Sequence, residues 1–395
     1  MGLGLIKILN NARIGVLPAL AVFVLIAAAC GGSSEEADSS GSAPETPVAG
    51  DDATPQRSVL LPEIVGIANW INSEPTSVEA ELERGNVVLI DFWTYTCVNC
   101  LRTMPHLKGW QEKYADNGLT ILGVHAPEFE FEKDFDNVRD AVKRVGVTWP
   151  VAQDNDMATW RRFGNRYWPA KYLFSIDDEI VYSHFGEGDY AETELAIREQ
   201  LTAAGHDIND IPFEPLADDV RDREATSQTR ELYGGYARSY ASQQGLYNGQ
   251  EAYYSGPDQV LDYEDEGKPT DGQYFLMGLW ENRAESIAHA REDPELEDHL
   301  RVPFSARSVN IVIDPAGPEP FEVVVDLDGV PLTQEQAGSD IVFKDDGSSV
   351  LQVSEPRLYA VLESPEFLQD SLFFRSASPN FAMFAFTFGV YLEGA

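Results

Sequence analysis

The sequence predicts two folded domains, an α/β layered domain followed by an all-β sandwich, and three observations lead to this prediction. The chain has 395 residues, which suggests two domains plus further segments. Between residues 77 and 204, strand-like apolar runs alternate with segments of helical spacing, which is typical of α/β layers. From residue 229 onward, short alternating runs are separated by turn signals such as Asp328-Gly329, which is typical of an antiparallel sandwich.

The composition is strongly acidic. The chain carries 28 Lys and Arg residues against 66 Asp and Glu residues, a formal net charge of −38 at pH 7. Binding a nucleic-acid backbone needs clustered positive charge, so we expect no nucleic-acid partner. The charge predicts a well-solvated and self-repelling surface.

The first 58 residues indicate export followed by a membrane tether. In residues 1–29, Lys7 and Arg13 precede an apolar run of residues 14–29, as in a signal peptide. Small residues before Cys30 and glycines after it resemble a bacterial lipoprotein signal, in which the chain is cleaved before Cys30 and its thiol carries lipid; an uncleaved membrane anchor is the alternative. Residues 30–58 lack aromatic side chains and are predicted to be a disordered tether. We therefore expect a lipid-anchored protein on the extracytoplasmic face of the bacterial cell membrane.

The first domain is predicted over residues 59–205, with a polar linker over residues 206–228. Helical spacing predicts helices over residues 77–84, 97–117 (broken or kinked at Pro105), 131–145, 157–163 and 192–204. Buried strands are predicted over residues 87–92, 119–125 and 151–153, and a hairpin over residues 170–177 and 179–185.

A Cys-x-x-Cys pair, Cys97 and Cys100, follows a predicted strand and opens a predicted helix. The N-terminus of a helix stabilises a thiolate, so Cys97 is placed to be a nucleophile, and Cys100 can close a disulfide with it. Structural zinc normally needs four ligands, and the chain has only one other cysteine, Cys30. A purely structural disulfide would constrain little of the chain because its loop is so short. We predict a redox dithiol, with no metal and no cofactor.

The residues around the dithiol form a more specific pattern. It comprises Asp91-Phe92-Trp93, Cys97 with Cys100, Pro105, Gly123-Val124-His125-Ala126-Pro127-Glu128-Phe129, Tyr167-Trp168-Pro169-Ala170 and His184-Phe185-Gly186-Glu187-Gly188. This pattern resembles the thioredoxin superfamily, in particular its TlpA/ResA-like members and the periplasmic thioredoxin domain of DipZ-type proteins. The resemblance covers about 150 residues continuously.

The resemblance implies a role for each of four catalytic residues. Cys97 would attack a substrate disulfide, and Cys100 would resolve the mixed disulfide. Pro169 matches the family's cis-proline, which lies beside the dithiol in space. Asp91 matches a buried carboxylate behind the second cysteine, and burial would raise its pKa and make it a proton acceptor for Cys100. An aspartate held by backbone donors is the alternative for Asp91.

Three aromatic residues are predicted to bind substrate. The resemblance implies that Trp168 presents its backbone to an incoming peptide. Tyr95 is expected to face the partner protein, and Trp93 is expected to pack beneath the active-site loop, at the substrate-binding region.

The sequence departs from the ResA-like pattern at one position near the dithiol. Thr103 stands where ResA-like enzymes place a glutamate three residues after the second cysteine. Glu128 and Glu130 are candidate replacements, although a solvated loop is the favoured interpretation. For His125, a packing role is favoured over a proton shuttle.

The second domain is predicted over residues 229–395. Strands are expected over residues 274–280, 308–313, 321–327, 349–353, 358–362, 371–375 and 382–391. The order of these runs and the ending Phe384-Ala385-Phe386-Thr387-Phe388-Gly389 resemble, more loosely, the carbohydrate-binding-module-like domain of DipZ-type proteins. His289 and His299 are expected in a solvated, acidic helical stretch. The domain's tyrosines could line a ligand groove, but a role in the core is favoured.

The predicted function is a membrane-tethered, extracytoplasmic thiol-disulfide oxidoreductase. Its partners would be disulfide-containing exported proteins, including apocytochromes c, and the resemblance implies a separate transmembrane thiol carrier as electron donor. A thiol peroxidase of the peroxiredoxin class is an alternative, since Thr94 fits that signature, although Ile90 replaces its proline. A sugar-binding or adhesion lipoprotein is the other alternative.

Overall fold

A computed structural model describes residues 62–216, 227–241, 246–247, 249, 256–265, 267–268 and 270–391. The predicted signal peptide, Cys30 and the predicted tether lie outside the described residues, as do residues 217–226 of the predicted linker. Among the helices that the structure describes, none is both long enough and apolar enough to cross a membrane.

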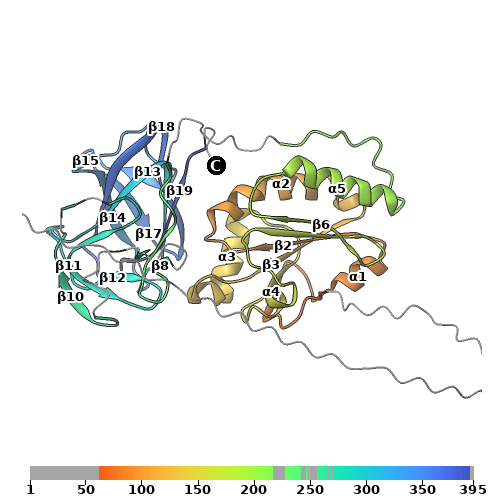
Figure 1. Ribbon diagram of the computed structural model, residues 1–395, viewed down its shortest axis with the longest axis horizontal. Coiled ribbons are helices and arrows are strands. Elements are labelled where there is room, and N and C mark those ends of the chain that lie inside the picture. Colours follow the sequence, from red (N-terminus) through yellow and green to blue (C-terminus); the bar gives the residue numbers. More distant parts are fainter. Residues whose placement is uncertain are drawn as a thin grey trace, which may run out of the picture. The chain divides into compact units, whose positions relative to one another are not determined.

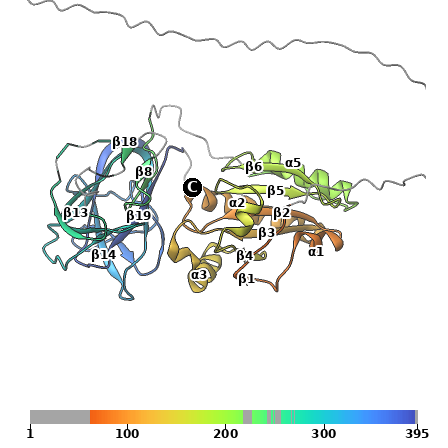
Figure 2. The ribbon, with the colours of Figure 1, turned by 60° about the horizontal axis from the view of Figure 1, so that its bottom comes forward.

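The first domain is built on a six-stranded sheet in the order β1-β4-β3-β2-β5-β6, which Figures 1 and 2 show from two sides. Its strands are β1 (Asn69–Ile71), β2 (Val87–Trp93), β3 (Leu119–His125), β4 (Val151–Gln153), β5 (Ala170–Phe174) and β6 (Ile180–Phe185). The central strands β2, β3 and β4 run parallel, whereas β1, β5 and β6 pair antiparallel with their neighbours. This confirms the predicted α/β fold class.

Helices cover both faces of the sheet, so its central strand β2 is buried at every position. The helices are α1 (Val78–Glu83), α2 (Val98–Tyr114), α3 (Phe135–Val145), α4 (Ala158–Arg162) and α5 (Tyr190–Ala203). Val87 and Leu89 pack with side chains of α2, α3 and α5, whereas Val88 and Ile90 pack on the opposite side with α1 and α4. Because side chains alternate along a strand, Asp91 points to the face that α2 covers.

The predicted helix over residues 131–145 begins later than expected. A short 3₁₀ helix, η2 (Glu130–Lys133), precedes α3, and another, η1 (Ala115–Asn117), follows α2. The helix α3 begins after Asp134 because the Asp134 carboxylate accepts hydrogen bonds from the backbone N–H groups of Asp136 and Asn137. Within the segment predicted as a linker, Ile208 is buried against the core of the first domain.

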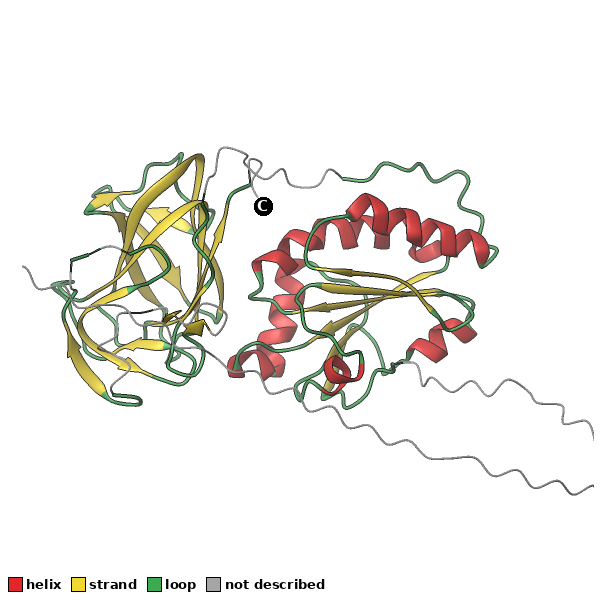
Figure 3. Ribbon diagram, viewed as in Figure 1, coloured by secondary structure: helices red, strands yellow, loops and turns green. Residues whose placement is uncertain are grey.

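The second domain consists of strands, as Figure 3 shows, and the pairings within its large sheet are antiparallel. The sheet has eleven strands, of which nine follow the main path β10-β11-β12-β19-β13-β18-β14-β17-β16, while β15 pairs with β14 and β7 pairs with β19. Strand β11 also pairs with β13, so the sheet folds back on itself. A single apolar cluster that includes Trp280, Leu300 and Phe374 fills it. This arrangement is consistent with the predicted β-sandwich. The strands are β7 (Leu232–Tyr233), β8 (Tyr240–Ala241), β9 (Leu246–Tyr247), β10 (Val260–Tyr263), β11 (Phe275–Asn282), β12 (Ile287–His289), β13 (His299–Ile313), β14 (Phe321–Leu327), β15 (Val330–Pro331), β16 (Ile341–Phe343), β17 (Ser349–Val353), β18 (Arg357–Arg375) and β19 (Ala382–Gly389).

One prediction about this domain was wrong. His289 and His299 were expected in a solvated helical stretch, but they end β12 and begin β13. His289 is buried, and the ring of His299 lies 3.2 Å from a carboxylate oxygen of Asp265. The helical spacing failed here because short strands and turns alternate within a few residues.

Candidate active site

The two cysteines of the dithiol differ in their access to solvent. Cys97 is the N-cap residue of α2 and is half-buried, whereas Cys100 is fully buried. Both are free thiols, and the backbone N–H of Cys100 donates a hydrogen bond to the Cys97 sulfur at 3.2 Å. Only Cys97 can therefore be reached by a disulfide from outside.

Cys100 is held in its protonated form. Burial raises the pKa of the Cys100 thiol well above its ordinary value, and hydrogen bonding to Cys97 raises it further. The nearby charges of Cys97 and Asp91 act in the same direction. Cys100 therefore needs a proton acceptor before it can act as a nucleophile.

Asp91 on β2 has the properties of such an acceptor. Its side chain is only 1% exposed, and neither carboxyl oxygen has a hydrogen-bond partner among the described residues. Burial raises the pKa of Asp91 from 3.8 to about 7, while the positive charge of Lys171 lowers it. The prediction of a raised pKa is confirmed, and the alternative of an aspartate held by backbone donors is not.

Lys171 is a buried partner of this carboxyl group that the sequence did not reveal. It lies on β5 directly opposite Asp91 in the antiparallel pairing with β2, so the two side chains share one face of the sheet. Its ammonium group is buried with no hydrogen-bond partner in the described part of the chain, and it lies 5.4 Å from the ring centroid of Tyr190. Burial lowers the pKa of Lys171, and the charge of Asp91 opposes this effect.

The peptide bond between Trp168 and Pro169 is cis, as predicted. The Pro169 carbonyl accepts a hydrogen bond from the backbone N–H of Gly186 at 2.8 Å, which fixes this loop to the end of β6. The Trp168 indole N–H donates to the carbonyl of Ala126 at 3.0 Å, and its ring packs 4.2 Å from that of Trp160. The Trp168 side chain is thus held in place while it stays half-buried.

The burial of Trp93 agrees with its expected position beneath the active-site loop, but the burial of Trp93 and Tyr95 does not agree with the prediction that they bind substrate. Trp93 is 0% exposed and Tyr95 is 1% exposed. Tyr95 stacks on His125 with the ring centroids 5.6 Å apart, and Trp93 meets the same ring edge-on at 5.4 Å. Both rings therefore support the active-site loop from beneath. Burial lowers the pKa of His125 to about 3, so His125 packs as a neutral ring and is not suited to be a proton shuttle.

Glu132 is a second buried acid that the sequence did not reveal. Its carboxylate accepts hydrogen bonds from the hydroxyls of Thr94 at 2.6 Å and Thr96 at 2.5 Å, and from the backbone N–H groups of Glu128 and Phe129. Burial raises the pKa of Glu132 to about 7. The residue ties η2 to the loop that precedes Cys97.

The glutamate of ResA-like enzymes has no replacement at the positions considered. Thr103 is buried, donates to the carbonyl of Asn99 at 2.9 Å and lies 3.1 Å from the Tyr190 hydroxyl. Glu128 forms an ion pair with Arg238 at 2.7 Å, and Glu130 pairs with a lysine on the exposed side of η2. Both carboxylates are therefore engaged by basic side chains.

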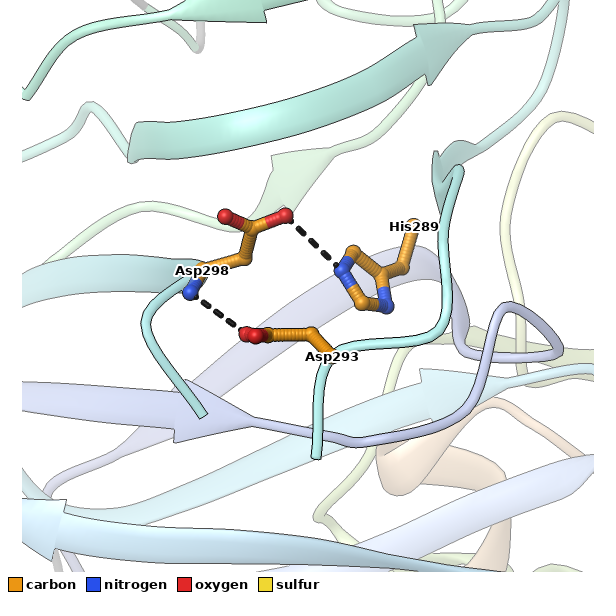
Figure 4. Close-up of side chains that lie close together, drawn as sticks. All are labelled: His289, Asp293 and Asp298. Atoms are coloured by element: carbon orange, nitrogen blue, oxygen red, sulfur yellow. Dashed lines mark hydrogen bonds and ion pairs between the residues drawn. The ribbon is translucent and has the colours of Figure 1, made fainter. Parts of the chain in front are cut away.

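A separate cluster of possible metal ligands lies in the second domain (Figure 4). Ligand atoms of His289, Asp293 and Asp298 lie within 4.8 Å of one another. The guanidinium of Arg291 donates to both carboxyl oxygens of Asp298, at 2.5 and 2.8 Å, and so supplies the positive charge that this carboxylate needs. We assign the cluster a structural role, because it connects β12 to the start of β13.

Two protein families match the chain in succession. The Redoxin family matches residues 51–197, and the family described as "Thioredoxin like C-terminal domain" matches residues 229–389. Protein DipZ of Mycobacterium tuberculosis is 34% identical over 279 residues, which are 70% of this chain and 38% of DipZ. The chain thus spans well under half the length of this relative.

Smaller relatives match the first domain. Thiol-disulfide oxidoreductase YkuV of Bacillus subtilis is 31% identical over 128 residues, which cover 32% of this chain and 83% of YkuV. A solved thioredoxin-like protein in the oxidised form is 27% identical, with a TM-score of 0.33, and the match covers 36% of this chain and 95% of that protein. On these sequence matches, the chain belongs to the thioredoxin superfamily, and its first domain is similar to the thiol-disulfide oxidoreductase YkuV.

Proposed function

We propose that the chain uses Cys97 and Cys100 to reduce disulfides in exported proteins. One observation carries this proposal: the two sulfurs lie together, but only one of them is accessible. An accessible nucleophile next to a buried thiol is the arrangement that a two-step exchange through a mixed disulfide requires.

The proposed reaction balances through these two sulfurs. The Cys97 thiolate attacks one sulfur of the substrate disulfide, which forms a mixed disulfide and releases the other substrate sulfur as a thiolate. Cys100 then loses its proton and attacks the Cys97 sulfur, which releases the second substrate thiolate. The substrate gains two electrons, and the enzyme is left with a disulfide between Cys97 and Cys100.

Asp91 is the group that we propose takes the proton from Cys100. Its pKa of about 7 allows it to be ionised in part of the molecules at neutral pH and to accept a proton there. Lys171 stabilises the ionised form of Asp91 and so acts as a positioning residue for this step.

The proposed setting is the extracytoplasmic face of the cell membrane, with the chain anchored through lipid on Cys30. The lipoprotein-like pattern before Cys30 supports this setting. The resemblance to DipZ-type proteins supports apocytochromes c among the substrates and a separate transmembrane thiol carrier as the electron donor. The aligned part of DipZ is 38% of that protein, so both partners belong to the proposal alone.

A peroxidase function is less well supported. In the peroxidase alternative, Thr94 would belong to the peroxide-binding signature. In this chain the Thr94 hydroxyl is fully buried and donates to Glu132 at 2.6 Å. It is therefore already engaged away from the face at which Cys97 is reached.

The test is to trap substrates on the full chain with the substitution Cys100→Ala. This variant keeps the backbone N–H that donates to the Cys97 sulfur but cannot resolve a mixed disulfide. We expect membrane fractions of cells that produce it to contain exported proteins linked to Cys97 through bonds that a reductant releases.

The matched control is the double variant Cys97→Ser with Cys100→Ala, which should trap nothing. Equal trapping by the variant and its control, or adducts only with cytoplasmic proteins, would refute the proposed function.

A further inference from the structure

Two cavities border the dipeptide between the cysteines, and Arg102 lines both of them. Their volumes are about 680 and 700 Å³, a size typical of ligand sites. Both cavities are also lined by Val98, which follows Cys97 directly, and by Tyr391 from the end of the second domain. A substrate segment that occupies either cavity therefore lies against Arg102 and against Val98, the residue next to Cys97.

Arg102 lies on α2, five residues after the N-cap residue Cys97. Val98 and Arg102 are four residues apart on this helix, so they lie one turn from each other on the same face. Arg102 is only 8% exposed. Gly389 leaves space for its guanidinium, because a Cβ atom at that position would lie 2.8 Å from Arg102 Nη2.

The guanidinium of Arg102 is weakly engaged by its neighbours. It lies 3.4 Å from the side-chain oxygen of Asn99, 3.6 Å from the carboxylate of Glu187 and 4.7 Å from the ring centroid of Tyr391. Its Nε has no hydrogen-bond partner among the described residues. Since a guanidinium offers five donors, these long contacts leave capacity for a carboxylate that approaches from the cavity.

Other arginines of the same cavity differ in this respect. Arg144 and Arg357 also line the first cavity, but each forms an ion pair, at 2.9 Å with Glu355 and at 2.8 Å with Asp340. Arg102 is thus a guanidinium of the cavity whose carboxylate partner, Glu187, lies at the longer distance of 3.6 Å.

The local charge of the first cavity differs from that of the chain. Its lining includes four arginines and three acidic residues, whereas the whole chain has 28 basic and 66 acidic residues. At physiological salt, charges more than about 8 Å away are largely screened. An anionic group beside Arg102 therefore responds mainly to the charged side chains closest to it and less to the overall negative charge of the chain.

From this geometry we propose that Arg102 binds a carboxylate of the substrate next to its disulfide. The preferred substrate class is an oxidised polypeptide with an aspartate or glutamate beside the half-cystine that Cys97 attacks. Arg102 holds this segment and exchanges neither electrons nor protons. The proposal rests on the proposed function of the dithiol.

The test measures kcat/KM of the full chain for two synthetic disulfide peptides. The peptides differ only in a glutamate or a glutamine next to the half-cystine, and dithiothreitol regenerates the enzyme. We expect the unmodified chain to prefer the glutamate peptide about tenfold, because charge-assisted hydrogen bonds to arginine are strong. In Arg102→Gln the ratio of the two values should fall to near one, and Arg102→Lys should restore part of it.

The ratio of kcat/KM for the glutamate peptide to kcat/KM for the glutamine peptide separates substrate binding from a general loss of structure, since misfolding lowers both kcat/KM values together. Arg84→Gln is the matched control, because Arg84 is an exposed arginine at the end of α1 that pairs with Glu81 and lines neither cavity, and it should keep the tenfold preference. An unchanged ratio in Arg102→Gln, or no preference in the unmodified chain, overturns the proposal. If Cys97→Ser still reduces both peptides, the proposed function fails instead.

Discussion

The substitution Asp91→Asn tests whether the buried carboxyl group lowers the stability of the folded protein above neutral pH. Asparagine keeps the shape of the side chain but cannot ionise. Folding raises the pKa of Asp91 from 3.8 to about 7. Between these two pH values the folded protein therefore keeps a proton that the unfolded chain has released. The stability that this proton contributes is present below about pH 4 and is lost as the pH rises through about 7.

The size of the effect follows from the two pKa values. At about 1.4 kcal/mol per pH unit, a change from 3.8 to about 7 corresponds to a loss of at most about 4 kcal/mol. About 1.5 kcal/mol of this is lost by pH 5, and the full amount is lost by pH 8. The stability gained by Asp91→Asn should therefore be about 2.5 kcal/mol larger at pH 8 than at pH 5.

The assay is urea denaturation of the reduced full chain and of the variant at both pH values. Tryptophan fluorescence reports mainly on the first domain, because six of the seven tryptophans precede residue 205. Glu132, whose pKa is raised to about 7, titrates in both proteins, so its effect cancels in the comparison. An equal gain in the free energy of unfolding at both pH values would refute the reasoning.

In the same variant, release of a mixed disulfide should slow by about 100-fold, the usual contribution of a general base.

Two further substitutions test the neighbours of the dithiol. Lys171→Met removes the charge that lowers the pKa of Asp91, so the pH profile for release of a mixed disulfide should move to higher pH, whereas Lys171→Arg should leave it near its original place. An unchanged profile in Lys171→Met would contradict the role of this residue. Glu132→Gln leaves some of its four donors without an acceptor and should lower the free energy of unfolding by about 2 kcal/mol in urea. Glu130→Gln, on the exposed side of the same short helix, should change it by less than about 0.5 kcal/mol, and equal effects would show that burial is not the cause.

Periodicity predicted the centre of the first domain well because β2, β3, α2 and α5 are long and regular. The run that became β2 is apolar at nearly every position, as a central strand covered on both faces requires. The second domain was harder to predict, since β12 and β16 have three residues each and carry no readable alternation. The long strand β18 contains acidic residues on its exposed side, and it was therefore divided into two shorter strands.

The active-site residues that could be predicted from the sequence are those that match the pattern of the thioredoxin superfamily. Cys97, Cys100, Pro169 and Asp91 were placed in this way, and the structure brings the two cysteines together and shows Pro169 in a cis peptide bond. Lys171 was missed because its position opposite Asp91 depends on the register of two strands that lie about 80 residues apart. The burial of Tyr95 was missed for a similar reason, since side chains from distant segments pack around it.

The buried pair of Asp91 and Lys171 is best explained by its chemistry. Both groups lie in the centre of the sheet without hydrogen-bond partners among the described residues, and apolar side chains of similar size would cost less there. Buried polar groups are normally hydrogen-bonded, and this pair beside Cys100 departs from that rule. Such departures are expected at functional sites. The carboxyl group that lowers stability as the pH rises is also the one that we propose accepts the proton of Cys100. The gain in stability and the loss of mixed-disulfide release in Asp91→Asn should therefore appear together, because both follow from removing one ionisable group.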